Sequence, residues 1–153
     1  MEKVIIIRYA EIHLKGKNRG WFEKVFAVNI EKNLKGIRHE LRRLSGRYLV
    51  ENFNEEDTDT VVNRLMKVFG IHSISIAQKV SSDMQNIYEA ALSVCPETGT
   101  FKVETHRADK TFSLNSMQIS AEIGGKLLEN NKNLKVDGHN PQLTVYIYLL
   151  EKR

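Results

Sequence analysis

The sequence predicts an α+β protein built from two consecutive units, residues 1–80 and 81–153. Three observations support this fold class. Apolar residues switch repeatedly between the period of a strand and that of a helix. In the first unit these segments follow the order strand, helix, strand, strand, helix, strand. The composition, with 41% hydrophobic residues, 27% charged residues and two prolines, is typical of a folded globular chain.

The first unit has the order βαββαβ, which predicts a ferredoxin-like domain with both helices on one face of an antiparallel sheet. Lys3–Tyr9 contains four consecutive β-branched residues, which indicates a strand buried on both faces. A helix should follow, because apolar residues recur at helical spacing from Phe22 to Leu34, and Gly36 can end it. Next we expect a hairpin of two strands, 39–44 and 47–51, that turns at Ser45-Gly46. A second helix should start at Asp57 or Thr58, with the apolar stripe Val61, Val62, Leu65, Met66 and Phe69. A last strand should contain Ile71, Ile74, Ile76 and Val80.

The second unit is expected to be an α/β domain that lacks its final strand or strands. The chain stops soon after the strand 143–149, where a further strand would normally cover the edge. Capping boxes are expected at residues 82–85 and 115–118. Cys95, the only cysteine, lies on the apolar stripe of the first helix, which predicts a buried apolar role. The other expected segments are a strand at 101–105, a helix through Ile119, Ile123, Leu127 and Leu128, and a short strand at 136–137.

Charge is distributed unevenly along the chain. Residues 1–53 carry 12 Lys and Arg against 6 Glu, whereas the remainder carries 11 Lys and Arg against 13 Asp and Glu. A basic N-terminal third suggests a polyanionic partner, although a solubilising surface would have the same composition. No apolar run approaches the roughly 20 residues that a membrane helix needs. The N-terminus has no apolar core typical of a signal peptide, so we expect a cytoplasmic protein without a membrane partner.

Two segments could contact a polyanion. Residues 8–19, RYAEIHLKGKNR, join the first strand to the first helix and combine several cations with a helix N-terminus, which would suit phosphate groups. Residues 106–110, HRADK, lie between a strand and a capped helix. There Arg107 and Lys110 could contact phosphates and His106 could stack on a base. An ordinary solvated loop remains the alternative at both places. A third cluster, Arg42, Arg43 and Arg47, is better explained as the charged end of a hairpin.

Catalytic and metal-binding patterns are scarce. The five histidines are scattered without the spacing of metal ligands, and a single cysteine excludes an internal disulfide and a cysteine-based zinc site. The chain contains neither a glycine-rich nucleotide loop nor a nucleophile motif. We therefore expect that it binds a partner and does not catalyse a reaction by itself.

The motif at 8–19, followed by Phe22-Glu23, resembles the N-terminal signature of the tRNA 4-thiouridine synthetase family, also called tRNA sulfurtransferase or the thiamine-biosynthesis sulfur carrier enzyme. Residues 101–112, FKVETHRADKTF, resemble the family's THUMP domain, an RNA-binding module. The likeness continues through Ser116, Ile119, Gly124, Val136-Asp137, Asn140-Pro141 and the strand Val145–Leu149.

The resemblance implies a tRNA-binding fragment without its enzyme activity. Members of the family normally continue into an ATP- and magnesium-dependent domain that adenylates a uridine, and some add a rhodanese domain; this chain contains neither motif. No cofactor is therefore expected in the chain itself, and a sulfur-donor protein would act only through the missing domains. The whole protein would make 4-thiouridine and take part in sulfur transfer to the thiazole of thiamine.

The family's two N-terminal domains hold the single-stranded 3′ acceptor end of tRNA, which implies a set of contacts in this chain. Two alternatives remain: an RNA-binding module of another THUMP-containing tRNA-modifying enzyme, or an interaction module that forms a homodimer through the strand Leu143–Leu150. A small stand-alone enzyme is disfavoured by the missing motifs. The expected RNA contacts are Lys15, Lys17, Asn18, Arg19, Arg107 and Lys110, followed by Arg8, Tyr9 and His106 as second choices.

Overall fold

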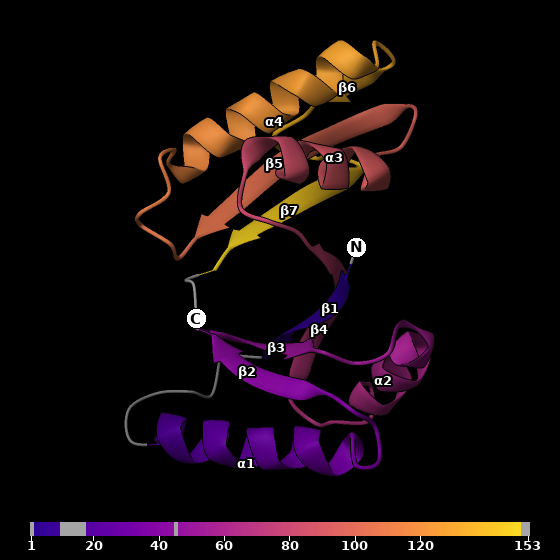
Figure 1. Cartoon of the computed structure of the whole chain (residues 1–153), viewed down its shortest axis with the longest axis vertical. Helices are drawn as coiled ribbons and strands as arrows, with labels where there is room; N and C mark the ends of the chain where they lie inside the picture. The colour runs from indigo at the N-terminus through magenta and orange to yellow at the C-terminus, as the bar shows by residue number, and fades with distance from the viewer. Residues whose placement is uncertain (1, 10–17, 45, 151–153) are drawn as a thin grey trace. The chain divides into compact units, whose positions relative to one another are not determined.

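Figure 1 shows the computed structural model, which describes residues 2–9, 18–44 and 46–150. The chain divides into two compact units, Met1–Lys79 and Val80–Arg153, and each is described by itself. The α+β class is confirmed, as is the βαββαβ order of the first unit.

The first unit is a four-stranded antiparallel sheet in the order β2-β3-β1-β4 with two helices. The apolar strand β1 lies inside the sheet, where Ile5 pairs with Val50 on one side and Ile76 on the other. The elements are β1 (Glu2–Tyr9), α1 (Asn18–Asn33), β2 (Glu40–Leu44), β3 (Arg47–Glu51), the 3₁₀ turn η2 (Glu55–Asp57), α2 (Thr58–Leu65) and β4 (Ile71–Lys79).

Both helices of the first unit pack on the same face of the sheet. Ile30 of α1, Leu65 of α2 and Ile7 of β1 belong to one core cluster, and none of the three side chains is accessible to solvent. Burying a side chain of this size stabilises the fold by about 1.5–3 kcal/mol. All four residues Val4–Ile7 are at most 6% exposed, which confirms the prediction of a strand buried on both faces.

The apolar stripe predicted for the second helix is wrong at its C-terminal end. The helix α2 ends at Leu65, and Met66 and Phe69 are 70% and 93% exposed. The amide of Val68 bonds to the carbonyl of Leu65, a three-residue step that tightens the last turn. This tightening places Val68 in the core instead of Phe69. Ile76 lies in β4, as expected, and its side chain is exposed on this edge strand of the sheet.

The second unit contains a three-stranded parallel sheet in the order β6-β5-β7 and two helices. Ile87 of α3 and Ile119 of α4 belong to one core cluster with Phe101, so both helices cover the same face. The edge strand β7 pairs only with β5 among the described residues. The elements are α3 (Met84–Val94), β5 (Gly99–Arg107), α4 (Ser116–Asn130), β6 (Leu134–Val136) and β7 (Leu143–Leu149).

The two helix starts of this unit differ from each other. The capping box at Asn115 and Gln118 is confirmed, with both reciprocal bonds present at 2.8 and 2.9 Å. The helix α3 is capped by Asp83, whose carboxylate accepts from the amide of Asn86 at 2.9 Å, so the predicted box at residues 82–85 is wrong. Asp83 caps the helix in place of Ser82, because its carboxylate is a stronger acceptor for the first-turn amides of α3 than the hydroxyl of Ser82 is.

Cys95 follows the last turn of α3 and is partly buried against the core of the second unit, which agrees with its predicted apolar role. Burial raises the pKa of its thiol. Within the described part of the chain, every helix is too short or too polar to span a bilayer.

Candidate nucleic-acid interface

The first basic segment is described only at its two ends. Lys15 and Lys17 fall within residues 10–17, outside the described residues. Asn18 is the first residue of α1, and its side chain also lies outside the description. The contacts expected of these three residues therefore stay predictions. What the structure shows is how Tyr9, Arg19 and Arg8 are held.

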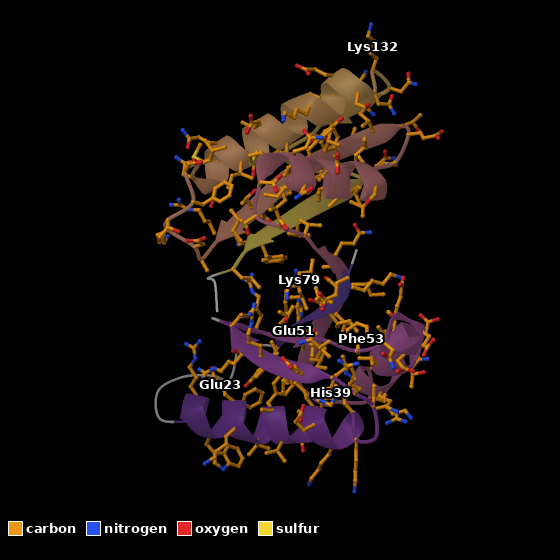
Figure 2. All side chains as sticks on the ribbon, in the orientation of Figure 1. Glu23, His39, Glu51, Phe53, Lys79 and Lys132 are labelled. Carbon is orange, nitrogen blue, oxygen red and sulfur yellow. The ribbon has the colours of Figure 1, made fainter. Side chains whose placement is uncertain are left out.

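A buried carboxylate joins the two ends of this segment. Glu23 on α1 is 4% exposed and is labelled in Figure 2. Its Oε1 accepts from the hydroxyl of Tyr9 at 3.3 Å and from Nε of Arg19 at 3.2 Å, and its other oxygen pairs with the guanidinium of Arg43. Residues 9 and 19 thus converge on one side chain. Because this carboxylate pairs with two arginines and accepts from a phenol, it holds the side chains of Tyr9 and Arg19, which flank residues 10–17.

Tyr9 has a packing role in this arrangement. Its ring is 4% exposed and lies 5.4 Å from the ring of Phe26, centroid to centroid. Burial raises the pKa of its hydroxyl, and the neighbouring carboxylate of Glu23 raises it further. The phenol therefore stays a neutral donor to Glu23 across the physiological range. No short-range sequence pattern indicates this role, because the pairing of Tyr9 with Glu23 depends on how β1 packs against α1.

Arg8 points to the other face of β1, since neighbouring side chains alternate along a strand. Its guanidinium donates to the hydroxyls of Ser73 and Ser75 on β4, at 3.3 and 2.9 Å. This cross-strand bonding holds Arg8 over the sheet face that carries no helix.

The second basic loop is organised by Arg107 at the end of β5. Its Nη1 donates to the backbone carbonyls of Phe112 and Leu114, both at 3.2 Å. Asp109 is 8% exposed and accepts from the backbone amide of Thr111 at 2.9 Å. The amide of Ala108 also bonds to the carbonyl of Leu149 at 2.7 Å, which ties the loop to the end of β7. These bonds fix the backbone on both sides of Lys110.

Lys110 and Arg107, expected as equivalent phosphate contacts, therefore occupy different environments. Lys110 is exposed near the tip of the loop, whereas Arg107 is half buried and holds the loop together. Sequence spacing cannot separate the two, because the carbonyls that bind Arg107 are brought to it by the loop's own path.

His106 does not stand alone on the sheet face. Its ring lies 5.1 Å from that of Tyr148 and 6.5 Å from that of Tyr146, centroid to centroid. We call His106, Tyr146 and Tyr148 the ring row. The carboxylate of Glu104 lies 3.9 Å from Nε2 of His106. The alternation of residues 143–149 is enough to place Tyr146 and Tyr148 on one face of a strand, but it does not indicate that His106 lies beside them.

The third cluster of arginines has structural partners. Arg43 pairs with Glu23, and Arg42 lies 3.6 Å from Glu51, a carboxylate that is 1% exposed. Lys79 reaches the same Glu51 at 3.1 Å (Figure 2). This agrees with the interpretation of the cluster as part of the charged hairpin, because at least two of its members neutralise buried carboxylates.

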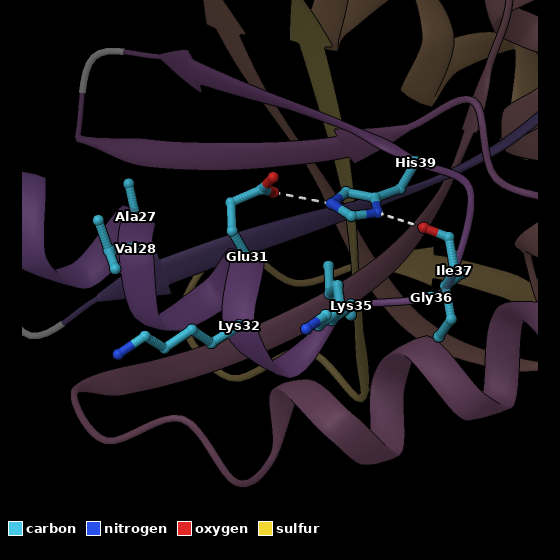
Figure 3. A pocket seen from close by; sticks show the side chains of 9 residues that line it. Ala27, Val28, Glu31, Lys32, Lys35, Gly36, Ile37 and His39 are labelled. Atoms are coloured by element: carbon cyan, nitrogen blue, oxygen red, sulfur yellow. Dashed lines mark hydrogen bonds and ion pairs between the residues drawn. The ribbon is translucent and has the colours of Figure 1, made fainter.

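Two other kinds of site were considered, a surface depression and a cluster of metal-binding side chains. An open depression of about 550 Å³ lies where α1 leads into β2 (Figure 3). On its wall, His39 bonds through Nε2 to Glu31 and through Nδ1 to the carbonyl of Ile37, both at 2.7 Å. Both ring nitrogens are thereby used within the wall. In the described ranges, three or more His, Cys, Asp or Glu side chains nowhere gather in a way that could hold a metal ion.

Comparisons with known proteins agree with this division of the chain. Residues 4–75 match the ThiI ferredoxin-like domain and residues 81–153 match the THUMP domain. Relatives named probable tRNA sulfurtransferase include those of Clostridium acetobutylicum, 41% identical, and Caldanaerobacter subterraneus, 40% identical. Each match covers 99% of this chain and 40% of the relative, so the chain spans about two fifths of the length of these proteins.

Two solved structures are similar over nearly the whole chain. The crystal structure of PH1313 from Pyrococcus horikoshii superposes with a TM-score of 0.80 at 32% identity, covering 97% of this chain and 51% of that one. A 4-thiouridine synthetase in complex with RNA and bound ATP superposes with a TM-score of 0.73 at 32% identity, covering 97% and 38%.

The fold and the two family matches define a ferredoxin-like domain of the ThiI type followed by a THUMP domain. This pair of domains, together with the likeness to named relatives over 99% of its length, places the chain in the tRNA sulfurtransferase family, and the chain spans about 40% of the length of those relatives.

Proposed function

We propose that this chain binds the single-stranded 3′ acceptor end of tRNA and is the RNA-recognition part of a tRNA sulfurtransferase. The observation that carries the proposal is the 32% identity, over 97% of the chain, to a 4-thiouridine synthetase solved in complex with RNA. The exposed Lys110 supports it, because hydrogen bonds on both sides hold its loop and the loop presents this cation on a fixed backbone.

In the whole protein, a catalytic domain outside this chain would use ATP and magnesium to convert a uridine to 4-thiouridine. Sulfur-donor proteins would act on that part of the protein, and the same sulfur would supply the thiazole of thiamine. This chain would need no cofactor for its own task. Its tRNA substrate would place the protein in the cytoplasm.

The test compares two RNA minihelices, one with its unpaired 3′ end and one trimmed of it, by fluorescence anisotropy over a range of salt concentrations. The intact minihelix should bind much more tightly, since each stacked base contributes about 1–3 kcal/mol. With roughly four phosphate contacts to a single strand, the slope of log affinity against log salt should be near −3. Equal affinity for the two minihelices would reject recognition of the end.

Charge reversal then assigns the contacts. Lys15→Glu with Lys17→Glu should weaken binding, and Lys110→Glu should do so independently. Lys132→Glu is the matched control, because Lys132 is an exposed lysine of the same unit. Lys110 precedes α4 and Lys132 follows it, and this helix of 15 residues is roughly 22 Å long. Salt-insensitive self-association without RNA binding would favour a dimerisation module through β7 instead.

A further inference from the structure

The ring row lies on the face of the second unit's sheet that points away from α3 and α4. The parallel register of β5 and β7 sets His106 opposite Tyr148. Val145 and Leu149 belong to the core under the helices, so the intervening Tyr146 and Tyr148 project to the other face. The sheet itself therefore brings these three rings together.

The three rings are nearly parallel. The planes of His106 and Tyr148 differ by 12°, those of Tyr146 and Tyr148 by 17°, and those of His106 and Tyr146 by 20°. The centroids of the two tyrosine rings are 6.3 Å apart. Because the three planes are nearly parallel, a further flat aromatic group can stack on the row in the same orientation.

Core packing does not account for the whole row. A cross-strand aromatic pair would explain His106 with Tyr148 as a device that stabilises the sheet. Tyr146, however, is 49% exposed and the side chain of His106 is 43% exposed. The row therefore offers aromatic surface to solvent on a regular, well-paired part of the sheet.

Cations lie along the chain at both ends of the row. Lys102 is on the same strand and the same face as His106, because their positions differ by four and side chains alternate along a strand. The ordered loop that carries Lys110 follows directly after Arg107. Exposed rings for bases combined with cations for the backbone are what proteins use to bind unpaired RNA.

We propose that the ring row is a stacking platform for unpaired nucleobases of RNA, with Tyr146 as its most accessible ring. This inference rests on the proposed RNA-binding function and adds to it a particular surface, the helix-free face of β5 and β7. Stacking on such a platform tolerates any base, because every base has a π-face.

The experiment uses a single-stranded hexaribonucleotide carrying one 2-aminopurine, whose fluorescence is quenched when it stacks. It is titrated with the full chain and with Tyr146→Leu, Tyr146→Phe and Tyr148→Leu. The two leucine variants should bind about 5- to 150-fold more weakly and lose the quenching, while Tyr146→Phe, which keeps the ring, should retain both. Tyr88→Leu is the matched control, because Tyr88 lies on α3 and packs on the helix side of the sheet.

The outcomes separate the two proposals. If Lys110→Glu weakens binding but the leucine variants bind and quench as the unchanged chain does, RNA binding stands and the stacking platform is wrong. If the unchanged chain does not bind the oligonucleotide or the minihelix at all, the proposed function itself fails. Circular dichroism confirms that each variant is folded. If light scattering shows that Tyr146→Leu dissociates a dimer without changing RNA affinity, the row is a contact between two copies and the platform is rejected.

Discussion

Replacing Arg107 by alanine should reveal whether this residue contacts RNA or only shapes the loop that does. In the structure its Nη1 donates to the carbonyls of Phe112 and Leu114. Alanine removes both bonds and leaves two carbonyls near the N-terminus of α4 without this donor. We expect the loop to lose its fixed path, so that Lys110 is no longer held in place.

The magnitude follows from these two bonds. A hydrogen bond from a charged donor contributes about 1.5–3 kcal/mol. Arg107 is only half buried, so water can replace part of each bond, and we expect a total loss of about 1–3 kcal/mol. For a unit of this size the urea dependence of the unfolding free energy is about 1 kcal/mol per molar, so the midpoint should fall by about 1 M or more. Arg107→Lys should recover at most part of this loss, because an ammonium lacks the planar geometry of a guanidinium.

The assay is urea denaturation followed by circular dichroism, paired with the affinity for the intact minihelix measured well below the midpoint. Arg107→Ala should lower both quantities. Lys110→Ala should lower only the affinity, because its exposed side chain has no part in holding the loop. If Arg107→Ala lowers the affinity and leaves the midpoint unchanged, the reasoning is refuted and Arg107 binds phosphate directly.

Three further predictions concern other parts of the chain. Glu23→Gln should destabilise the first unit by about 1–3 kcal/mol in chemical denaturation, because it weakens the bonds of Arg19, Arg43 and Tyr9 to one buried group. The exposed control Glu89→Gln should change the unfolding free energy by less than about 0.5 kcal/mol. Equal unfolding midpoints for the two variants would contradict a stabilising role of Glu23. Stability should fall as pH rises above about 9, because burial raises the pKa of Cys95, Tyr9 and Tyr48 in the folded chain and the unfolded chain releases these protons first; a flat profile between pH 8 and 10.5 would contradict this. The isolated chain should neither adenylate nor thiolate tRNA when ATP is present, and turnover above a protein-free control would overturn its description as a binding fragment.

Much of the fold could be predicted from local patterns in the sequence. The run of β-branched residues at 4–7 identifies a buried strand wherever it lies in a sheet, because its two faces are both apolar. The capping box at Asn115 and Gln118 needs only residues three positions apart, so the start of α4 is determined locally. The order of such segments was sufficient to predict the βαββαβ arrangement.

Local patterns failed where small changes of geometry alter burial. The stripe of α2 includes Met66 and Phe69 at helical spacing, but the tightened turn after Leu65 exposes both and buries Val68 instead. At the start of α3, Asp83 and not Ser82 is the cap, because a carboxylate is a stronger acceptor for the first-turn amides. These two errors lie at the end of one helix and the start of another, where the hydrogen-bond pattern changes within one turn.

The sequence by itself determined which segments form strands and helices, which regions are basic, and which family the chain resembles, because these properties belong to residues close together in the chain. Only the tertiary structure decided what individual side chains do. Glu23 becomes a clamp because β1, α1 and β2 bring Tyr9, Arg19 and Arg43 to it. His106 joins Tyr146 and Tyr148 because β5 pairs with β7, residues some forty positions apart. Contacts of this kind depend on strand pairing and helix packing across the unit, and no short-range pattern encodes them.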